Sequence, residues 1–187
     1  QSRMGRVPQA ARLGQRADPR HLSGLLHGGG LLQDYKEDIY VGYRYFETFN
    51  KDAVLYPFGF GLGFAKFERK LLSTENDSTA IKLKVSTKNI NETYSGKDVL
   101  QIYVEAPQGK LGKPARVLCA YEKSRTLNCG EEQEFELDIP FYTFASYADG
   151  GKTPYKSSYI IEKGIYNVYL GDNVRSAEKV YSFMGMC

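Results

Sequence analysis

Apolar and polar residues alternate strictly in four segments of the chain. Residues 81–86, 100–105, 134–139 and 166–170 each place apolar side chains at every second position. A period of two gives a strand one apolar face and one polar face. Turn-forming Asn, Asp, Gly and Pro separate these segments, and no helical stripe lies among them. The pattern therefore predicts a mainly β fold, an antiparallel sandwich of the fibronectin type III or immunoglobulin kind.

An aromatic stretch precedes the alternating half of the chain. Residues 39–46, IYVGYRYF, are β-branched and aromatic, which favours a strand or an extended arm. Residues 56–64, YPFGFGLGF, place glycine between aromatic side chains, a composition that disfavours helix. We expect this second run to be an extended linker whose rings pack on a neighbour. The sandwich is thus predicted at 66–187, behind an extended N-terminal arm at 34–65.

Composition changes sharply near residue 34. Residues 1–33 contain five Arg, one acid and no aromatic residue, whereas aromatics recur every few positions from Tyr35 onward. We expect residues 1–33 to be disordered or foreign to the fold. Both histidines, His21 and His27, lie in that segment, so no Ser-His-Asp or Cys-His pair can be assembled with the predicted fold. No metal-ligand spacing is present either, and we predict no metal and no cofactor.

Charge and hydropathy exclude two classes of partner. The net charge is +3, but residues 34–187 hold 20 bases and 21 acids and present no basic stripe for nucleic acid. No run approaches the roughly 20 apolar residues that a membrane span requires. The N-terminus lacks the apolar core of a signal peptide. These features favour a cytoplasmic location.

Three cysteines give no disulfide framework. Cys119, Cys129 and Cys187 form an odd and sparse set. A bridge between Cys119 and Cys129 would require paired strands and tight geometry. The simpler interpretation is a half-buried thiol and a turn thiol in a reducing compartment.

A second group of aromatic residues surrounds a loop rich in Gly, Lys and Ser. Its members are Tyr142, Phe144, Tyr147, Tyr155 and Tyr159. Exposed rings on a loop are suited to stacking on sugars, and Tyr147 and Tyr155 are the candidate substrate-binding residues. The alternative is that these rings close the end of the sandwich or pack on another domain.

Several motifs resemble family 3 glycoside hydrolases, the β-glucosidase type. Residues 35–46 (YKEDIYVGYRYF) and 56–67 (YPFGFGLGFAKF) are similar to the segments that join the family's α/β-sandwich domain to its fibronectin type III-like domain. Residues 96–104 (GKDVLQIYV) and 164–171 (GIYNVYLG) then follow in the family's order. The resemblance covers about residues 35–183. It implies that 34–65 is the end of the α/β-sandwich domain with a linker, and that the chain is a fragment.

The resemblance also bears on catalysis. The family uses a catalytic Asp on a barrel domain and an acid/base carboxylate on the α/β-sandwich domain, and neither motif occurs here. Glu134, Glu136 and Asp138 lie on the predicted solvent face of one strand, where acids keep an edge soluble. We therefore predict no catalytic residue, and leave open whether the chain has activity alone.

Two functional hypotheses follow. In the first, the chain is a non-catalytic structural module of a β-glucosidase, and the catalytic domains of that enzyme are its partners. The resemblance implies that the parent enzyme removes terminal β-D-glucosyl residues by a retaining two-carboxylate mechanism. In the second, it is a stand-alone module that binds β-glucosides or oligosaccharides.

Overall fold

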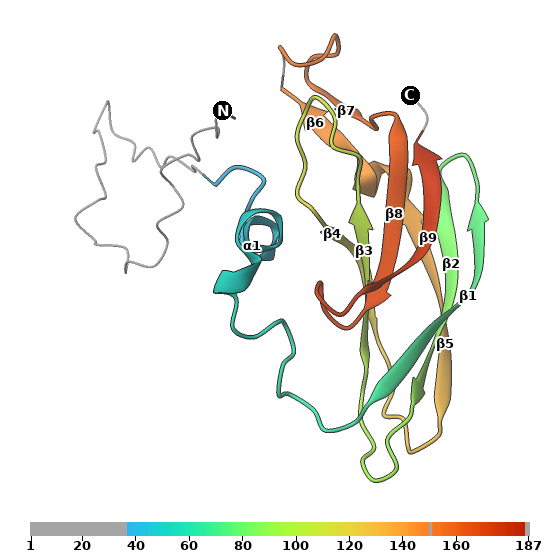
Figure 1. The fold of residues 1–187 in the computed structure, drawn as a ribbon. Helices are drawn as coiled ribbons and strands as arrows, with labels where there is room; N and C mark the ends of the chain where they lie inside the picture. Colours follow the sequence, from blue (N-terminus) through green and yellow to red (C-terminus); the bar gives the residue numbers. More distant parts are fainter. Residues whose placement is uncertain (1–36, 150, 186–187) are drawn as a thin grey trace, which may run out of the picture. The chain divides into compact units, whose positions relative to one another are not determined.

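The computed structural model describes residues 37–149 and 151–185, which are mainly β (Figure 1). A three-stranded sheet has the order β1-β2-β5, with bounds Phe67–Asn76, Ala80–Asn89 and Glu132–Pro140. A four-stranded sheet has the order β4-β3-β8-β9, with bounds Val117–Lys123, Val99–Glu105, Gly164–Gly171 and Glu178–Gly185. All neighbouring strands are antiparallel. The predicted antiparallel β-sandwich is confirmed.

Smaller elements lie at the margins of the two sheets. The hairpin of β6 (Ser146–Ala148) and β7 (Ser158–Ile160) lies at the upper end of the sandwich in Figure 1. A 3-10 helix, η4 (Phe141–Phe144), leads from β5 into this hairpin. Ahead of β1 are the helix α1 (Tyr43–Phe49) and the 3-10 helix η3 (Lys51–Ala53). Residues 1–33, including both histidines, fall outside the described residues.

The core consists of the apolar positions of the alternating strands. Buried side chains from β2, β3, β5 and β8 meet between the sheets: Ile81, Leu83, Val85, Leu100, Ile102, Val104, Leu137, Ile139, Tyr166, Val168 and Leu170. Burial of each such side chain stabilises the fold by roughly 1.5–3 kcal/mol. The predicted period of two thus assigns the inward face of these strands correctly.

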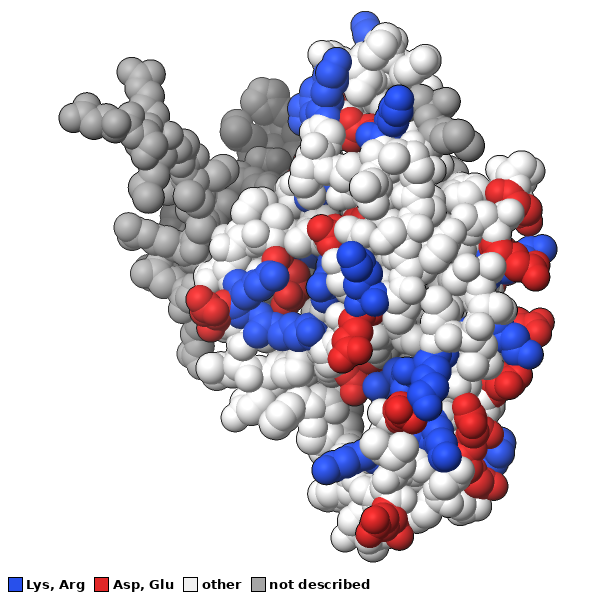
Figure 2. All heavy atoms as spheres, turned by 45° about the vertical axis from the view of Figure 1, so that its right-hand side comes forward, with Lys and Arg blue, Asp and Glu red and all other residues white. Residues whose placement is uncertain are grey.

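The outward face of the three-stranded sheet is charged. Glu134, Glu136 and Asp138 on the edge strand β5 are exposed, as the sequence predicts. Lys84 on β2 forms an ion pair of 2.8 Å with Glu134. Figure 2 shows basic and acidic side chains interspersed over the side that carries β1 and β2. Such a face remains in water and discourages pairing with another sheet edge.

The prediction of a strand or extended arm over residues 39–46 is wrong in its second half. Tyr43–Phe49 forms α1, which begins after Gly42, a residue with a positive φ of 59°. Isolated helices this short are unstable in water, so the contacts of α1 with the sandwich must select the helical conformation. Tertiary packing here overrides the β preference of the Tyr and Phe residues.

The glycine-rich linker bends rather than running straight. The amide N–H of Phe60 donates to the carbonyl oxygen of Pro57, and that of Leu62 donates to Gly59, so two turns follow each other. Gly59 and Gly61 adopt φ values of 78° and 73°, a region that favours glycine. The predicted linker is present, but it is not extended throughout, because these two glycines turn the chain.

The positions of two cysteines agree with the expected half-buried thiol and turn thiol. Cys119 on β4 is partly buried and Cys129 lies exposed in the turn before β5, and both are free thiols. Cys187 lies outside the described residues.

Candidate interaction surfaces

Polar contacts fix α1 on the outer face of the four-stranded sheet. The Tyr43 hydroxyl accepts a hydrogen bond of 2.8 Å from the backbone N–H of Leu118 on β4. The Tyr43 ring meets the Tyr103 ring edge-on, with 6.1 Å between centroids. At the other side of the helix, Arg175 donates to Glu47 over 2.8 Å. Together these contacts hold the helix against β3 and β4.

The helix changes the environment of β3. Gln101 and Tyr103 occupy the face that the alternating pattern marks as polar, yet each is only 3% exposed. Tyr103 donates a hydrogen bond to the side-chain oxygen of Gln101, and the Gln101 amide donates to the carbonyl oxygen of Asp172. Burial raises the pKa of Tyr103 above its ordinary value. Strand β3 is therefore buried on both faces.

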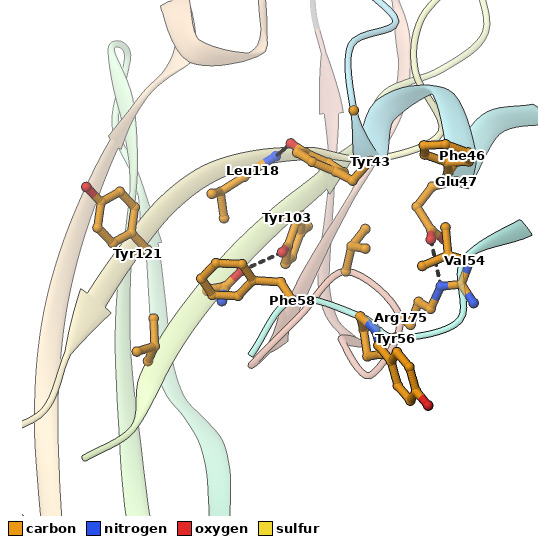
Figure 3. A pocket seen from close by; sticks show the side chains of 15 residues that line it. Tyr43, Phe46, Glu47, Val54, Tyr56, Phe58, Tyr103, Leu118, Tyr121 and Arg175 are labelled. Atoms are coloured by element: carbon orange, nitrogen blue, oxygen red, sulfur yellow. Dashed lines mark hydrogen bonds and ion pairs between the residues drawn. The ribbon is translucent and has the colours of Figure 1, made fainter. Parts of the chain in front are cut away.

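A cavity of about 560 Å³ lies between α1, the linker and the four-stranded sheet. Figure 3 shows Tyr43, Phe58, Tyr103 and Leu118 facing one another across it from these three elements. The hydroxyl groups of Tyr43 and Tyr103 are already engaged in the hydrogen bonds given above. The cavity is suited to an apolar group rather than to acid–base chemistry.

An exposed apolar surface continues from this cavity along the linker. Six large side chains between residues 55 and 64 are 63–86% exposed, and we call them the linker surface: Leu55, Tyr56, Phe58, Phe60, Leu62 and Phe64. Tyr56 and Phe58 also line the cavity. Contiguous exposed apolar side chains of this kind mark contact sites in soluble proteins.

Three tyrosines gather on the β6–β7 hairpin and η4. Tyr147 lies directly opposite Tyr159 in the hairpin, with ring centroids 5.2 Å apart. Tyr142 contacts Tyr159 with centroids 4.6 Å apart. All three are 51–63% exposed, and we call Tyr142, Tyr147 and Tyr159 the hairpin tyrosines. Phe144 instead packs in the core.

The second predicted binding residue, Tyr155, lies in the loop of the same hairpin. It is exposed, and among the described residues its ring makes no aromatic contact with the hairpin tyrosines. The structure thus places Tyr147 within a group of rings and Tyr155 apart from it. Binding of substrate by these two residues stays a prediction.

The buried carboxylates belong to structural ion pairs. Asp98 is buried and bonded to Arg69, and Asp172 approaches the same guanidinium at 3.5 Å. Glu162 lies 3.4 Å from the buried ammonium of Lys113. Within residues 37–149 and 151–185, no group of three or more His, Cys, Asp or Glu is arranged to hold a metal ion.

In the part of the chain that the structure describes, no helix has both the length and the apolar character needed to cross a bilayer.

Comparison with known proteins gives the class of this fold. Residues 98–174 match the fibronectin type III-like domain family. The chain is 44% identical over 149 residues to a β-glucosidase of Ruminococcus albus, covering 80% of this chain and 16% of that enzyme. It is also 44% identical over 159 residues to β-glucosidase A of Butyrivibrio fibrisolvens, covering 76% of this chain and 19% of that enzyme.

Solved structures agree with this class. A β-glucosidase from Paenibacillus barengoltzii superposes with a TM-score of 0.75 and 45% identity, over 79% of this chain and 16% of that one. β-Glucosidase 3B from Thermotoga neapolitana, solved with α-D-glucose, superposes with a TM-score of 0.70 and 36% sequence identity. The match covers 80% of this chain and 20% of that one. The protein is thus a fibronectin type III-like β-sandwich. More particularly, it belongs to the family 3 glycoside hydrolases, as the fibronectin type III-like part of such an enzyme.

The matches define how much of such an enzyme is present. The chain spans about a fifth or less of the length of the relatives named above. The matched region is one part of larger β-glucosidases, which confirms the predicted family.

Sequence reasoning missed the cavity and the residues that close it. Tyr43 and Glu47 on α1 are far in sequence from their partners Leu118 and Arg175, and no local pattern joins them. One signal was present: Gln101 and Tyr103 alternate with core residues of β3, and an aromatic side chain on an outward face indicates a covering element.

Proposed function

We propose that this chain is a structural, non-catalytic module that buries its linker surface against the remainder of a larger glycosidase. The observation that carries the proposal is the exposure of six large apolar side chains between residues 55 and 64. A surface of this kind is unfavourable in water and becomes favourable when a partner covers it. The relatives provide such a partner, since the matched region is a small part of each.

The cavity supports docking of the partner on the same side of the module. Because Phe58 and Tyr56 belong both to the cavity and to the linker surface, one apolar contact area runs from the linker to the foot of α1. An apolar side chain of the partner would fill the cavity and increase the area removed from water. The charged face of β1, β2 and β5 would remain exposed in the assembled enzyme.

The reaction of the whole enzyme is inferred from the relatives, which are named β-glucosidases. We propose that it hydrolyses terminal β-D-glucosyl residues with two carboxylates in a retaining mechanism, and that both carboxylates lie on the partner domains. The module would stabilise those domains and fix their positions. Its own carboxylates Asp98, which is buried, and Glu162, which is partly buried, are held in ion pairs that serve the sandwich.

The first test is an activity assay on the purified chain. It would be incubated with p-nitrophenyl β-glucoside, beside the intact β-glucosidase of Ruminococcus albus as positive control. We expect no turnover by the chain. Turnover that follows the chain through purification would show that it carries a catalytic site and would refute a purely structural role.

The second test addresses docking. Residues 37–185 would replace the matching region of the Ruminococcus albus enzyme, and activity and thermal stability of the chimera would be measured. Phe58→Ser with Phe60→Ser is expected to lower the melting temperature of the chimera, because both rings would leave the interface. Ile165→Ser is the control, since Ile165 is exposed on β8, away from the linker. Equal effects of the two changes would argue against docking through the linker surface.

A further inference from the structure

The hairpin tyrosines have no role in the sandwich core. Tyr142 and Phe144 lie two residues apart on η4, and only Phe144 points into the core, where its ring meets Phe141, Tyr166 and Phe183. The rings of Tyr142, Tyr147 and Tyr159 remain more than half exposed. The hairpin therefore gathers three large rings whose exposed parts are accessible to a ligand.

The composition of this group differs from that of the linker surface. The linker surface exposes mainly Leu and Phe, which favour a dry protein contact. Every exposed ring of the hairpin group carries a hydroxyl. A hydrogen bond with Tyr159 raises the pKa of Tyr142 above its ordinary value. An aromatic face with a polar rim suits a ligand that is itself amphipathic.

The three rings form one contiguous group. Tyr159 lies between the other two rings, tilted by 53° to Tyr142 and by 61° to Tyr147. The rings therefore present faces in different directions rather than one flat plate. The exposed loop that joins β6 to β7 adds the ammonium groups of Lys152 and Lys156 nearby in sequence, each with three donors.

From these observations we infer that the hairpin tyrosines bind a pyranose ring of an oligosaccharide. A pyranose offers an apolar C–H face to an aromatic ring and hydroxyls around its rim, which match the tyrosine faces and the polar groups beside them. The site lies on the β6–β7 hairpin, apart from the linker surface on the segment ahead of β1 (Figure 1). The inference does not depend on the structural role proposed above.

The test is a nuclear magnetic resonance titration of the ¹⁵N-labelled chain with cellohexaose. We expect the amide signals of residues 142–160 to shift, and those of residues 43–49 on α1 to stay in place. Tyr159→Ala should weaken binding by about tenfold, which corresponds to a lost aromatic contact of about 1.4 kcal/mol. Tyr159→Phe should retain most of the affinity, because the stacking face is kept.

A matched control makes the result specific. Tyr121 is 68% exposed on β4, outside the hairpin group, and Tyr121→Ala should leave the affinity unchanged. Tyr155→Ala, measured in parallel, reports on the second predicted binding residue. All variants should unfold at the same temperature as the natural chain, because the altered rings are exposed. Absence of any shift at millimolar cellohexaose, shifts confined to the cavity beneath α1, or equal loss in the Tyr121 variant would overturn the inference.

Discussion

Arg69 on β1 donates two hydrogen bonds to the buried carboxylate of Asp98, which lies directly ahead of β3. The Nε–Oδ2 and Nη2–Oδ1 distances are 2.9 and 2.5 Å. Thr87 on β2 donates to the same carboxylate over 2.6 Å. Since β1 and β2 belong to one sheet and β3 to the other, Asp98 joins the two layers of the sandwich at this end.

Replacing Asp98 should strongly destabilise the chain. Asp98→Asn removes the negative charge and leaves the Arg69 guanidinium, which is 14% exposed, without a full counter-charge. Breaking a buried ion pair in this way costs about 3–5 kcal/mol of unfolding free energy. Urea denaturation followed by circular dichroism measures the loss. Glu134→Gln is the control, because its ion pair with Lys84 is solvent-exposed and should contribute little to stability.

Helix α1 should depend on Tyr43. Tyr43→Ala removes the ring contact with Tyr103 and the acceptor for the Leu118 N–H, and we expect a loss of about 2–3 kcal/mol in unfolding free energy. Tyr43→Phe keeps the ring, so its loss should be about 1 kcal/mol. The same urea titrations test both. If the two variants are equally stable, the hydroxyl rather than the ring holds the helix.

The β1–β2 turn should respond to acid. Hydrogen bonds to Asp77, led by the backbone N–H of Thr79, lower the pKa of its carboxyl from 3.8 to about 2. A group with a lowered folded-state pKa stabilises the fold above its unfolded pKa, and that stabilisation is lost as pH falls through the folded value. Ionised Asp77 should therefore contribute fully above about pH 4 and lose its effect toward about pH 2. Carbon-13 resonances of the side chain report this titration. A midpoint near 3.8 would contradict the hydrogen-bonded turn.

The two described thiols should differ in reactivity. Burial raises the pKa of Cys119 to about 12, whereas Cys129 is exposed in a turn. At pH 8, iodoacetamide should alkylate Cys129 within minutes and spare Cys119, since the thiolate is the reacting form. A Cys187→Ser background restricts the measurement to these two residues. Peptide mass spectrometry gives the modified position, and urea should make Cys119 react as well.

The sequence predicted the interior of the sandwich because its strands carry a strict period of two. Ile81, Leu83 and Val85 lie inward as expected, and the charged positions of β5 lie outward. This agreement reflects one physical cause, since hydrophobic burial on a pleated strand is a local property.

The prediction failed where distant segments meet. Residues 43–46 are Tyr, Arg, Tyr and Phe, which favour strand, yet they form a helix because Tyr43 reaches Leu118 and Glu47 reaches Arg175. Gln101 is buried through a contact between segments that are also distant in sequence, since its side-chain amide donates to the carbonyl oxygen of Asp172. No window of a few residues contains these contacts, so local propensity cannot find them. The sequence grouped five aromatic residues around this loop, whereas in the structure Phe144 lies in the core and Tyr155 lies apart from the three rings that touch.

The burial of β3 on both faces also determines which segments must stay together when the domain is exchanged between genes. The fibronectin type III-like match begins at residue 98, whereas the cover of β3 begins at Gly42. A gene segment cut after the linker would encode β3 without the cover of its second face, which would leave Tyr103 and Leu118 exposed to water. Recombination that exchanges this unit between enzymes should therefore succeed only when the helix, the linker and the strands move together as one heritable block.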